Sequence, residues 1–531
     1  MFAAVRVSVS SMMRAAGSLR PVEPTSSIER EGSRSPRWKE DLLPLATILI
    51  LTLIYNWILL SHYYGYVYAY HDLALITDWF TNALYHSKPF WISEDSVNHL
   101  SIHFTPTLVL LIPLYLLSDS SYLLVLLGTL ALAASLYLGH RWWMALSRTY
   151  VQSVWVASAV SAALAAFIAL NAFTKTILDS AHIEIFYIPL FLGFAYSLRF
   201  HQKVRWAVLL CVLALGMREE AGLYLCLQTL ALLFLPGRPA VDPRRFRNRA
   251  LFFSGCALLY TMIAVKIIFP YFFGIHETSV ERGWSEWGNS WLQVTLNILT
   301  SPKLLFHHLE QSSFERLNRS FGYLPWLNPA MAALVNAPGL LLYTASHPDK
   351  RLLWFYHGSL LFAGFIPAFY AGFFQLLHWG ARILPRRMPF LLKRSRPLVG
   401  VALALALIGS LVNFPRTAAE RDGFAPRRSP IAVQNASFIR ECLKRCPNVS
   451  SVAADFRHIV FVPNRVERFL LDNAGKAQSL FIFEPAPGVP LDATIDESTR
   501  RFVEKAFVIA TETKGGRFYL RRGVDCHPLW Q

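Results

Sequence analysis

The sequence predicts an all-α polytopic membrane bundle of about ten or eleven transmembrane helices, followed by a small C-terminal α/β domain. Hydrophobic residues make up 54% of the 531 residues and aromatic residues 14%, which is more than a soluble protein carries. Several apolar segments approach the length of about 20 residues that a spanning helix needs. After Pro415, charged residues become more frequent and short β-rich runs appear, which is typical of a small α/β domain.

The expected spans follow one another with short polar breaks between them. In chain order they are 42–61, 121–139, 151–171, 183–199, 206–217, 221–236, 250–269, 303–327, 329–346, 352–377 and 398–414. The segment 303–327 is polar, and we include it because the parity of the topology requires a span there. The last span then leaves the C-terminus outside.

The formal net charge of +17 would suggest nucleic-acid binding in a soluble protein. Here the basic residues cluster in alternate breaks, which is the positive-inside pattern of a membrane protein. We therefore exclude nucleic acid as a partner and assign these breaks to the cytoplasm. The expected location is a bacterial inner membrane, with the N-terminus in the cytoplasm.

This topology divides the chain into three parts. Residues 1–41 are expected to form a disordered basic cytoplasmic tail without a cleavable signal. Residues 42–415 form the transmembrane domain, with external loops at 62–120 and 270–302. Residues 416–531 form the small extracytoplasmic α/β domain. It includes three short β-rich runs and a closing hairpin: VSSVAAD at 449, HIVFVP at 458, QSLFIFE at 478, and AFVIATET followed by RFYLRR.

Three cysteines lie in the predicted C-terminal domain, namely Cys442, Cys446 and Cys526. If the domain is extracytoplasmic, two of them can form a disulfide. The spacing of Cys442 and Cys446 also fits two free thiols on one face of a helix. The sequence leaves both alternatives open.

Ionisable residues gather at the external ends of the expected spans. A charged side chain at membrane depth costs about 2.5–3.5 kcal/mol on insertion scales, so such residues are candidate functional residues. The candidates are Asp72, Asp78, His103, Lys175, His182, Glu184, Arg218, Glu219, Glu220, Tyr356 and His357. The predicted topology puts all of them on one side of the membrane.

This set of residues suits group transfer to a hydroxyl or an amine. A carboxylate can act as general base on the acceptor while cations hold a phosphate leaving group. Asp72 is the predicted base, and Arg218 and Lys175 are the predicted phosphate-binding cations. Glu219 or Glu220 is expected to orient the arginine.

Structural alternatives exist for the same residues. Asp72 fits the N-cap of an amphipathic helix over 72–86, and Arg218 fits an ion pair inside the bundle. A divalent metal held by histidines and carboxylates also stays open, although no HExxH, CxxC or Walker motif occurs. The external stretch WSEWGNSW, 284–291, fits either an interfacial helix or a surface that stacks on sugar rings.

Five segments occur in an order that resembles a known family. They are YHDLALITDWFTNAL (70–84), HFTPTLVLLIPLY (103–115), LDSAHIEIFYIPL (178–190), MREEAGL (217–223) and FYHGS (355–359). Together they resemble the domain of unknown function 2079 family of predicted membrane proteins, which is similar to GT-C glycosyltransferases. The family's Lys-Glu-Asp motif is replaced here by Arg218, Glu219 and Glu220.

The resemblance implies a GT-C-like fold, an acidic base in the first external loop and a polyprenyl-phosphate sugar as donor. The family's site residues transfer to Asp72, His103, His182, Glu219 and His357. We therefore predict an integral membrane glycosyltransferase that contacts membrane lipid and moves a sugar to an unidentified extracytoplasmic acceptor. No cofactor is certain, and a divalent metal remains open. The alternatives are a lipid or solute transporter and a non-catalytic membrane scaffold.

Overall fold

The computed structural model describes most of the chain between residues 38 and 526. The described residues are 38–68, 73–147, 154–201, 203–236, 239, 241–273, 283–353, 355–387, 427–484, 497–513, 516–524 and 526. The described residues from Leu42 onward belong to one compact unit.

Five helices in the described part of the chain are long and apolar enough to cross a membrane. They are α2 (Trp38–Tyr63), α4 (Tyr122–Ser147), α7 (Tyr187–Phe200) with the 3-10 helix η4 (Ile183–Phe186) before it, α10 (Pro243–Ile263) with η6 (Ala264–Ile268) and α11 (Phe269–Phe273) after it, and α19 (Ser359–Arg387). A sixth candidate is the pair α5 (Val154–Ala169) and α6 (Ala172–Asp179), which is bent by 54°. The predicted class, a polytopic helical membrane protein, is confirmed.

Shorter apolar helices lie between these spans. They are η3 (Pro106–Leu117), α8 (Arg205–Leu215), α9 (Ala221–Ala231) with η5 (Leu232–Phe234), and α16 (Pro329–Asn336) with η8 (Ala337–Gly339) and α17 (Leu340–Tyr343). They occupy three of the predicted spans, 206–217, 221–236 and 329–346. The predicted last span, 398–414, lies outside the described residues.

The prediction of one helix over 303–327 is wrong. The structure divides this segment into α14 (Pro302–Gln311), α15 (Phe314–Ser320) and η7 (Leu324–Leu327). The chain leaves α14 at Ser313, whose N–H donates to the Arg351 carbonyl at 3.1 Å. After α15 it turns through Gly322 (φ 60°) and Tyr323 (φ 54°), both in the left-handed region that a helix cannot use.

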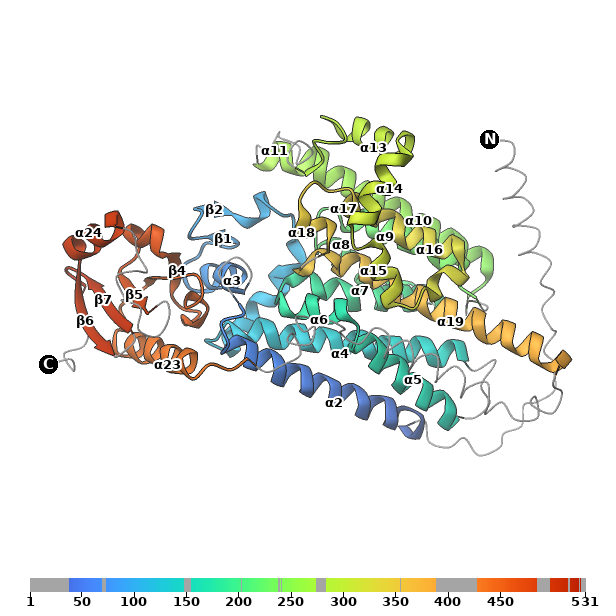
Figure 1. Cartoon of the computed structure of the whole chain (residues 1–531), viewed down its shortest axis with the longest axis horizontal. Helices are drawn as coiled ribbons and strands as arrows, with labels where there is room; N and C mark the ends of the chain where they lie inside the picture. Colours follow the sequence, from blue (N-terminus) through green and yellow to red (C-terminus); the bar gives the residue numbers. More distant parts are fainter. Residues whose placement is uncertain are drawn as a thin grey trace. The chain divides into compact units, whose positions relative to one another are not determined.

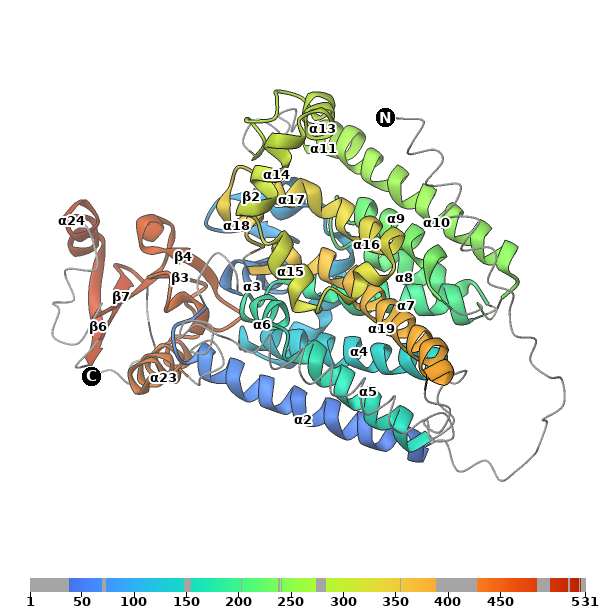
Figure 2. The same ribbon diagram turned by 45° about the vertical axis from the view of Figure 1, so that its right-hand side comes forward.

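The long helices pack closely in the bundle. Helix α4 lies against α5 and α7, and α19 lies against α7, as Figures 1 and 2 show. Helices α9 and α10 approach at Gly222, where a Cβ atom would lie only 2.1 Å from the Ala257 carbonyl oxygen. Such close backbone contact through small residues is typical of helix pairs in membranes.

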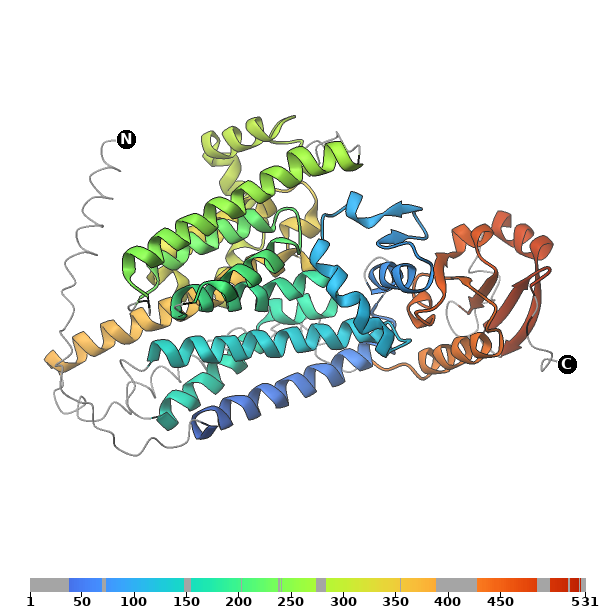
Figure 3. The same cartoon turned by 180° about the vertical axis from the view of Figure 1, so that it is seen from behind.

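The C-terminal region, which is red in Figure 3, contains a mixed sheet. The sheet has five strands in the order β4-β3-β5-β7-β6. The strands are β3 (Ser451–Ala454), β4 (Glu467–Leu470), β5 (Ser479–Phe483), β6 (Phe507–Thr513) and β7 (Gly516–Arg521), accompanied by helices α23 (Pro430–Arg445) and α24 (Glu497–Ala506). Strand β3 runs parallel to β4 and β5, while β7 is antiparallel to β5 and β6. The α/β class and the closing hairpin are therefore as predicted.

One predicted strand of this region is wrong. The run HIVFVP at 458–463 contains the 3-10 helix η10 (Ile459–Phe461). Asp455 starts this turn, because its carbonyl accepts the N–H groups of His458 and Ile459, each at 3.1 Å. Aspartate favours such local turns over an extended strand.

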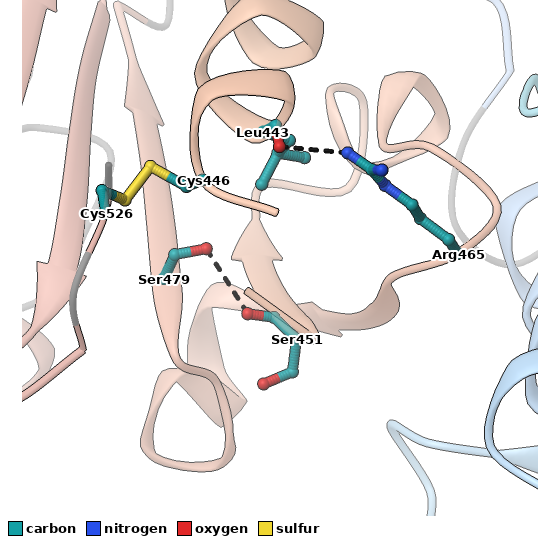
Figure 4. Close-up of a disulfide and its surroundings, with 6 residues drawn as sticks. All are labelled: Leu443, Cys446, Ser451, Arg465, Ser479 and Cys526. Atoms are coloured by element: carbon teal, nitrogen blue, oxygen red, sulfur yellow. Dashed lines mark hydrogen bonds between the residues drawn. A yellow bond between two sulfur atoms is a disulfide. The ribbon is translucent and has the colours of Figure 1, made fainter. Parts of the chain in front are cut away.

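Of the disulfides that the sequence allows, the structure contains the one between Cys446 and Cys526 (Figure 4). Cys446 ends α23, and its Cα atom lies 4.7 Å from that of Cys526. Cys442 is free and buried. The disulfide ties the end of the described chain to the first helix of the C-terminal region.

We predict that Cys526→Ser destabilises the C-terminal region by about 2–5 kcal/mol, because the lost disulfide closes a loop across a sequence separation of 80 residues. Thermal unfolding of the full-length protein without reductant measures the effect. The control is Cys256→Ser, which changes an exposed free cysteine of α10 and should leave the unfolding unchanged. If reductant leaves wild-type unfolding unaltered, the disulfide does not stabilise the protein.

Candidate functional site

Four breaks in the helix bundle bring ionisable side chains together. His103 follows the 3-10 helix η2 (His99–Ser101), and His182 is the residue before η4. Arg218 lies in the turn between α8 and α9, and His357 lies in η9 (Phe355–Gly358) before α19. Because each break ends a helix, its polar side chains lie at the end of the bundle and not along its length.

Arg218 is the centre of this group. Its guanidinium pairs with Glu184 through Nη1, and its Nε lies 3.4 Å from Glu220 Oε1 and 3.9 Å from Glu219 Oε1. The side chains of Arg218 and Glu184 are only 8% and 3% exposed, so the pair is shielded from water. The expectation that Glu219 or Glu220 contacts the arginine fits this geometry, and Glu184 adds a third carboxylate.

Glu219 also holds His103. Its Oε1 lies 3.0 Å from His103 Nδ1, and its Oε2 accepts the backbone N–H of Phe104 at 3.1 Å. A carboxylate on one ring nitrogen fixes the orientation of an imidazole and leaves the other nitrogen for a second partner. The His103 side chain is 29% exposed, so solvent or a ligand can reach this ring.

A further histidine, His99, lies beside this pair. Its ring is 5.7 Å from that of His103 and stacks on Trp79 with a centroid distance of 3.4 Å. Burial, followed by the charge of His103, lowers the pKa of His99 to about 2. His99 is therefore a neutral ring held by an aromatic face.

The charges of the cluster set its protonation states. Burial alone would raise the pKa of Glu219, but His103 and Arg218 lower it below its ordinary value, so Glu219 is ionised. Burial and the charge of Arg218 lower the pKa of His357 to about 3 and that of His182 well below its ordinary value. At neutral pH both histidines are neutral hydrogen-bonding groups.

Sequence reasoning missed one residue of the cluster, Lys350. It lies in the short helix α18 (Pro348–Arg351), and its Nζ is 5.7 Å from the centre of the Trp284 ring. Burial and the charge of Arg218 lower the pKa of Lys350, and the three glutamates that surround Arg218 oppose this effect. A lysine in a short segment between two helices resembles a solvated residue in sequence, and its position beside the FYHGS segment was the one available signal.

Other predicted site residues lie elsewhere. Lys175 pairs with Asp179 within α6, and Asp179 Oδ1 lies 3.1 Å from His62 Nδ1 at the end of α2. This places Lys175 in a second group that links α6 to α2. Asp72 lies outside the described residues, as does the side chain of Tyr356.

Asp78 joins the bundle to the C-terminal sheet. It is buried on α3 (Leu75–Tyr85), and its carboxylate accepts the N–H groups of Ser93 at 2.9 Å and of Arg468 at 3.4 Å. The guanidinium of Arg468, on β4, donates to Thr81 at 3.1 Å and to Ser121 at 3.4 Å. Burial raises the pKa of Asp78 to about 6, although the charge of Arg468 opposes this.

Two tryptophans of WSEWGNSW, Trp284 and Trp287, do not form the stacking surface that was one alternative. Trp287 is fully buried, and its indole N–H donates to the Thr344 carbonyl at 3.0 Å. Trp284 is 7% exposed and donates to the Leu341 carbonyl at 2.9 Å. In the described part of the chain, no group of three or more His, Cys, Asp or Glu side chains is arranged to hold a metal ion.

Fold and site together define a polytopic helical membrane protein with a buried ionic cluster at one end of its bundle. Residues 52–479 match the family described as "Predicted membrane protein (DUF2079)", and the chain belongs to this family. Comparison with curated protein sequences finds no match.

Two solved structures of ArnT from Cupriavidus metallidurans are similar to the chain. The apo structure is 13% identical, with a TM-score of 0.41, and the match covers 91% of this chain and 98% of that one. The structure bound to undecaprenyl phosphate is 12% identical, with a TM-score of 0.43, and the match covers 93% and 100% of the two chains.

The raised pKa of Asp78 predicts a pH-dependent stability. With a pKa of 3.8 when unfolded and about 6 when folded, protonated Asp78 favours the folded state. This contribution to the free energy of unfolding is complete below pH 3.8 and is lost as the pH rises through 6. The difference between the two pKa values of Asp78 corresponds to about 3 kcal/mol. Asp78→Asn should therefore flatten the change in unfolding free energy between these pH values.

Chemical denaturation of the full-length protein at several pH values measures this dependence. Asp95→Asn is the matched control, because Asp95 is an exposed aspartate in the segment that follows α3. A profile for Asp78→Asn that is as steep as the wild-type profile would show that another group titrates in this range.

Proposed function

We propose that this protein is an integral membrane glycosyltransferase that moves a sugar from a polyprenyl-phosphate donor to an extracytoplasmic acceptor. The observation that carries the proposal is the Glu219–His103 pair, at 3.0 Å, beside the buried Arg218. An imidazole held by an ionised carboxylate suits a hydrogen bond to a phosphate leaving group. The family resemblance and the lipid-facing helices agree with a lipid-linked donor.

In the proposed reaction, an acceptor oxygen attacks the anomeric carbon of the donor sugar. The new glycosidic bond forms as the bond between that carbon and the phosphate oxygen breaks, and polyprenyl phosphate leaves with the electron pair. Asp72 takes the proton of the acceptor hydroxyl. His103 donates a hydrogen bond to the phosphate, and Arg218 keeps Glu219 in place for this purpose.

His182 and His357 are assigned to substrate binding. Because both rings are neutral at pH 7, they can form hydrogen bonds with sugar hydroxyls and add no charge to the site. No step of the proposed reaction needs a metal ion or another cofactor.

The reaction is proposed for the extracytoplasmic face. Persistent disulfides belong to oxidising compartments, so the Cys446–Cys526 bond favours an external C-terminal region. The end of α2 contacts that region, because the Tyr63 hydroxyl donates to the Val460 carbonyl at 3.0 Å. The segment that carries Asp78 and His103 contacts it as well, through Arg468.

The arrangement of charges favours a transferase over the two alternatives. A transport pathway needs polar groups along the bundle, whereas the cluster described here lies at helix ends. A scaffold gives no reason for a cation of the cluster to lie without a carboxylate. Lys350 is partly exposed and forms no ion pair with a carboxylate of the described residues, which suits a cation that binds a ligand.

The proposal predicts that Asp72→Asn lowers the transfer rate at least about 100-fold, because general base catalysis contributes about 10²–10⁴-fold. The protein is purified in nanodiscs with a panel of synthetic polyprenyl-phosphate hexoses and an extract of periplasmic and membrane acceptors. Release of polyprenyl phosphate, measured by mass spectrometry, reports transfer whatever the acceptor is. Glu219→Gln should also reduce the rate, because a neutral amide holds the His103 ring more weakly than the carboxylate does.

Glu441→Gln is the control, because Glu441 is exposed on α23 and pairs only with Arg445 among the described residues. Its rate should equal that of the wild type. Full activity of Asp72→Asn would disprove the assignment of the base. If the wild-type protein releases no polyprenyl phosphate from any donor of the panel, the proposed function itself fails.

A further inference from the structure

Lys350 differs from the other cation of the cluster in its contacts. Arg218 is 8% exposed and is surrounded by three carboxylates, those of Glu184, Glu219 and Glu220. Lys350 is partly exposed and pairs with no carboxylate of the described residues. An incoming anion would have to displace glutamates to reach Arg218, whereas Lys350 has no carboxylate of the described residues paired with its ammonium group.

The lysine is held in place by an aromatic ring. Its Nζ lies 5.7 Å from the centre of Trp284, which is itself fixed by a hydrogen bond of 2.9 Å to the Leu341 carbonyl. A cation over an aromatic face is attracted by the π electrons of the ring and is not paired with an opposite charge. The contact therefore orients Lys350 without neutralising it.

The backbone after Lys350 turns sharply and leads into η9, which carries His357. Leu353 adopts φ 51°, in the left-handed region that a leucine rarely uses, and its N–H donates to the Lys350 carbonyl at 3.1 Å. Leu353 is 1% exposed, so packing maintains this turn. Burial, followed by the charges of Arg218 and Lys350, lowers the pKa of His357.

We propose that Lys350, and not Arg218, is the cation that contacts the phosphate group of the ligand in this cluster. This inference rests on the proposed function and deepens it, because it assigns a different role to each of the two cations. Lys350 binds the phosphate as a point charge, and Arg218 positions the carboxylates that orient His103. The phosphate group belongs to a lipid. Inorganic phosphate carries the same group, so the test compares the two ligands.

The test measures binding of three probes to the full-length protein in nanodiscs of zwitterionic lipid. The probes are a polyprenyl phosphate, the corresponding polyprenol and inorganic phosphate. Lys350→Gln should weaken binding of polyprenyl phosphate about ten-fold or more, since it removes a hydrogen bond between two charged groups. Lys350→Arg should retain most of the affinity, and the weak binding of polyprenol should be the same in all variants.

Lys303→Gln is the matched control, because Lys303 is an exposed lysine at the start of α14 outside the cluster. Thermal unfolding of each variant shows that the fold is intact. If the wild-type protein binds polyprenyl phosphate and Lys350→Gln binds it with the same affinity, the proposed role of Lys350 is wrong. This result would not contradict the proposed function. A wild-type protein that binds inorganic phosphate but no polyprenyl phosphate contradicts both the lipid source and the proposed donor.

Discussion

A buried guanidinium organises one end of this membrane bundle. Arg218 lies in the turn between two apolar helices, and a cation there is stable only if anions surround it. Glu184 comes from the start of another span, and Glu219 and Glu220 come from the turn itself. The ion pairs therefore fix the position of η4 relative to α8 and α9. Through Glu219 they also fix His103, so the geometry of the site depends on this one charge.

A second buried arginine connects the bundle to the C-terminal sheet. Arg468 is fully buried, and its N–H groups bond to α3, to Ser121 before α4 and to its own domain. Its backbone N–H also meets Asp78. These contacts are buried and come from three places in the bundle, Asp78 and Thr81 on α3 and Ser121 before α4. The C-terminal region is therefore packed against the bundle through Arg468.

The sequence predicted the membrane class and much of the cluster, because ionisable residues at membrane depth are rare and need partners. His103, His182, Arg218 and Glu219 were found by this rule. Lys175 was assigned to the same cluster, although its spacing of four residues from Asp179 also predicts the helical ion pair that the structure contains. Lys350 and Arg468 were missed because their burial arises from contacts between distant segments, which single-sequence patterns do not encode. The break of 303–327 depends likewise on a tertiary contact, between Ser313 and Arg351.

The two cations of this cluster have different surroundings, and these suit different roles. Arg218 lies among the carboxylates of Glu184, Glu219 and Glu220. The Nζ atom of Lys350 lies 5.7 Å from the centre of the Trp284 ring, and it forms no ion pair with a carboxylate of the described residues. A guanidinium has five N–H donors in a planar fork and can hold several carboxylates at once, whereas an ammonium group acts as a point charge. The arginine therefore suits the fixed ion pairs that position Glu219 and His103, and the lysine suits contact with an anion that binds and leaves.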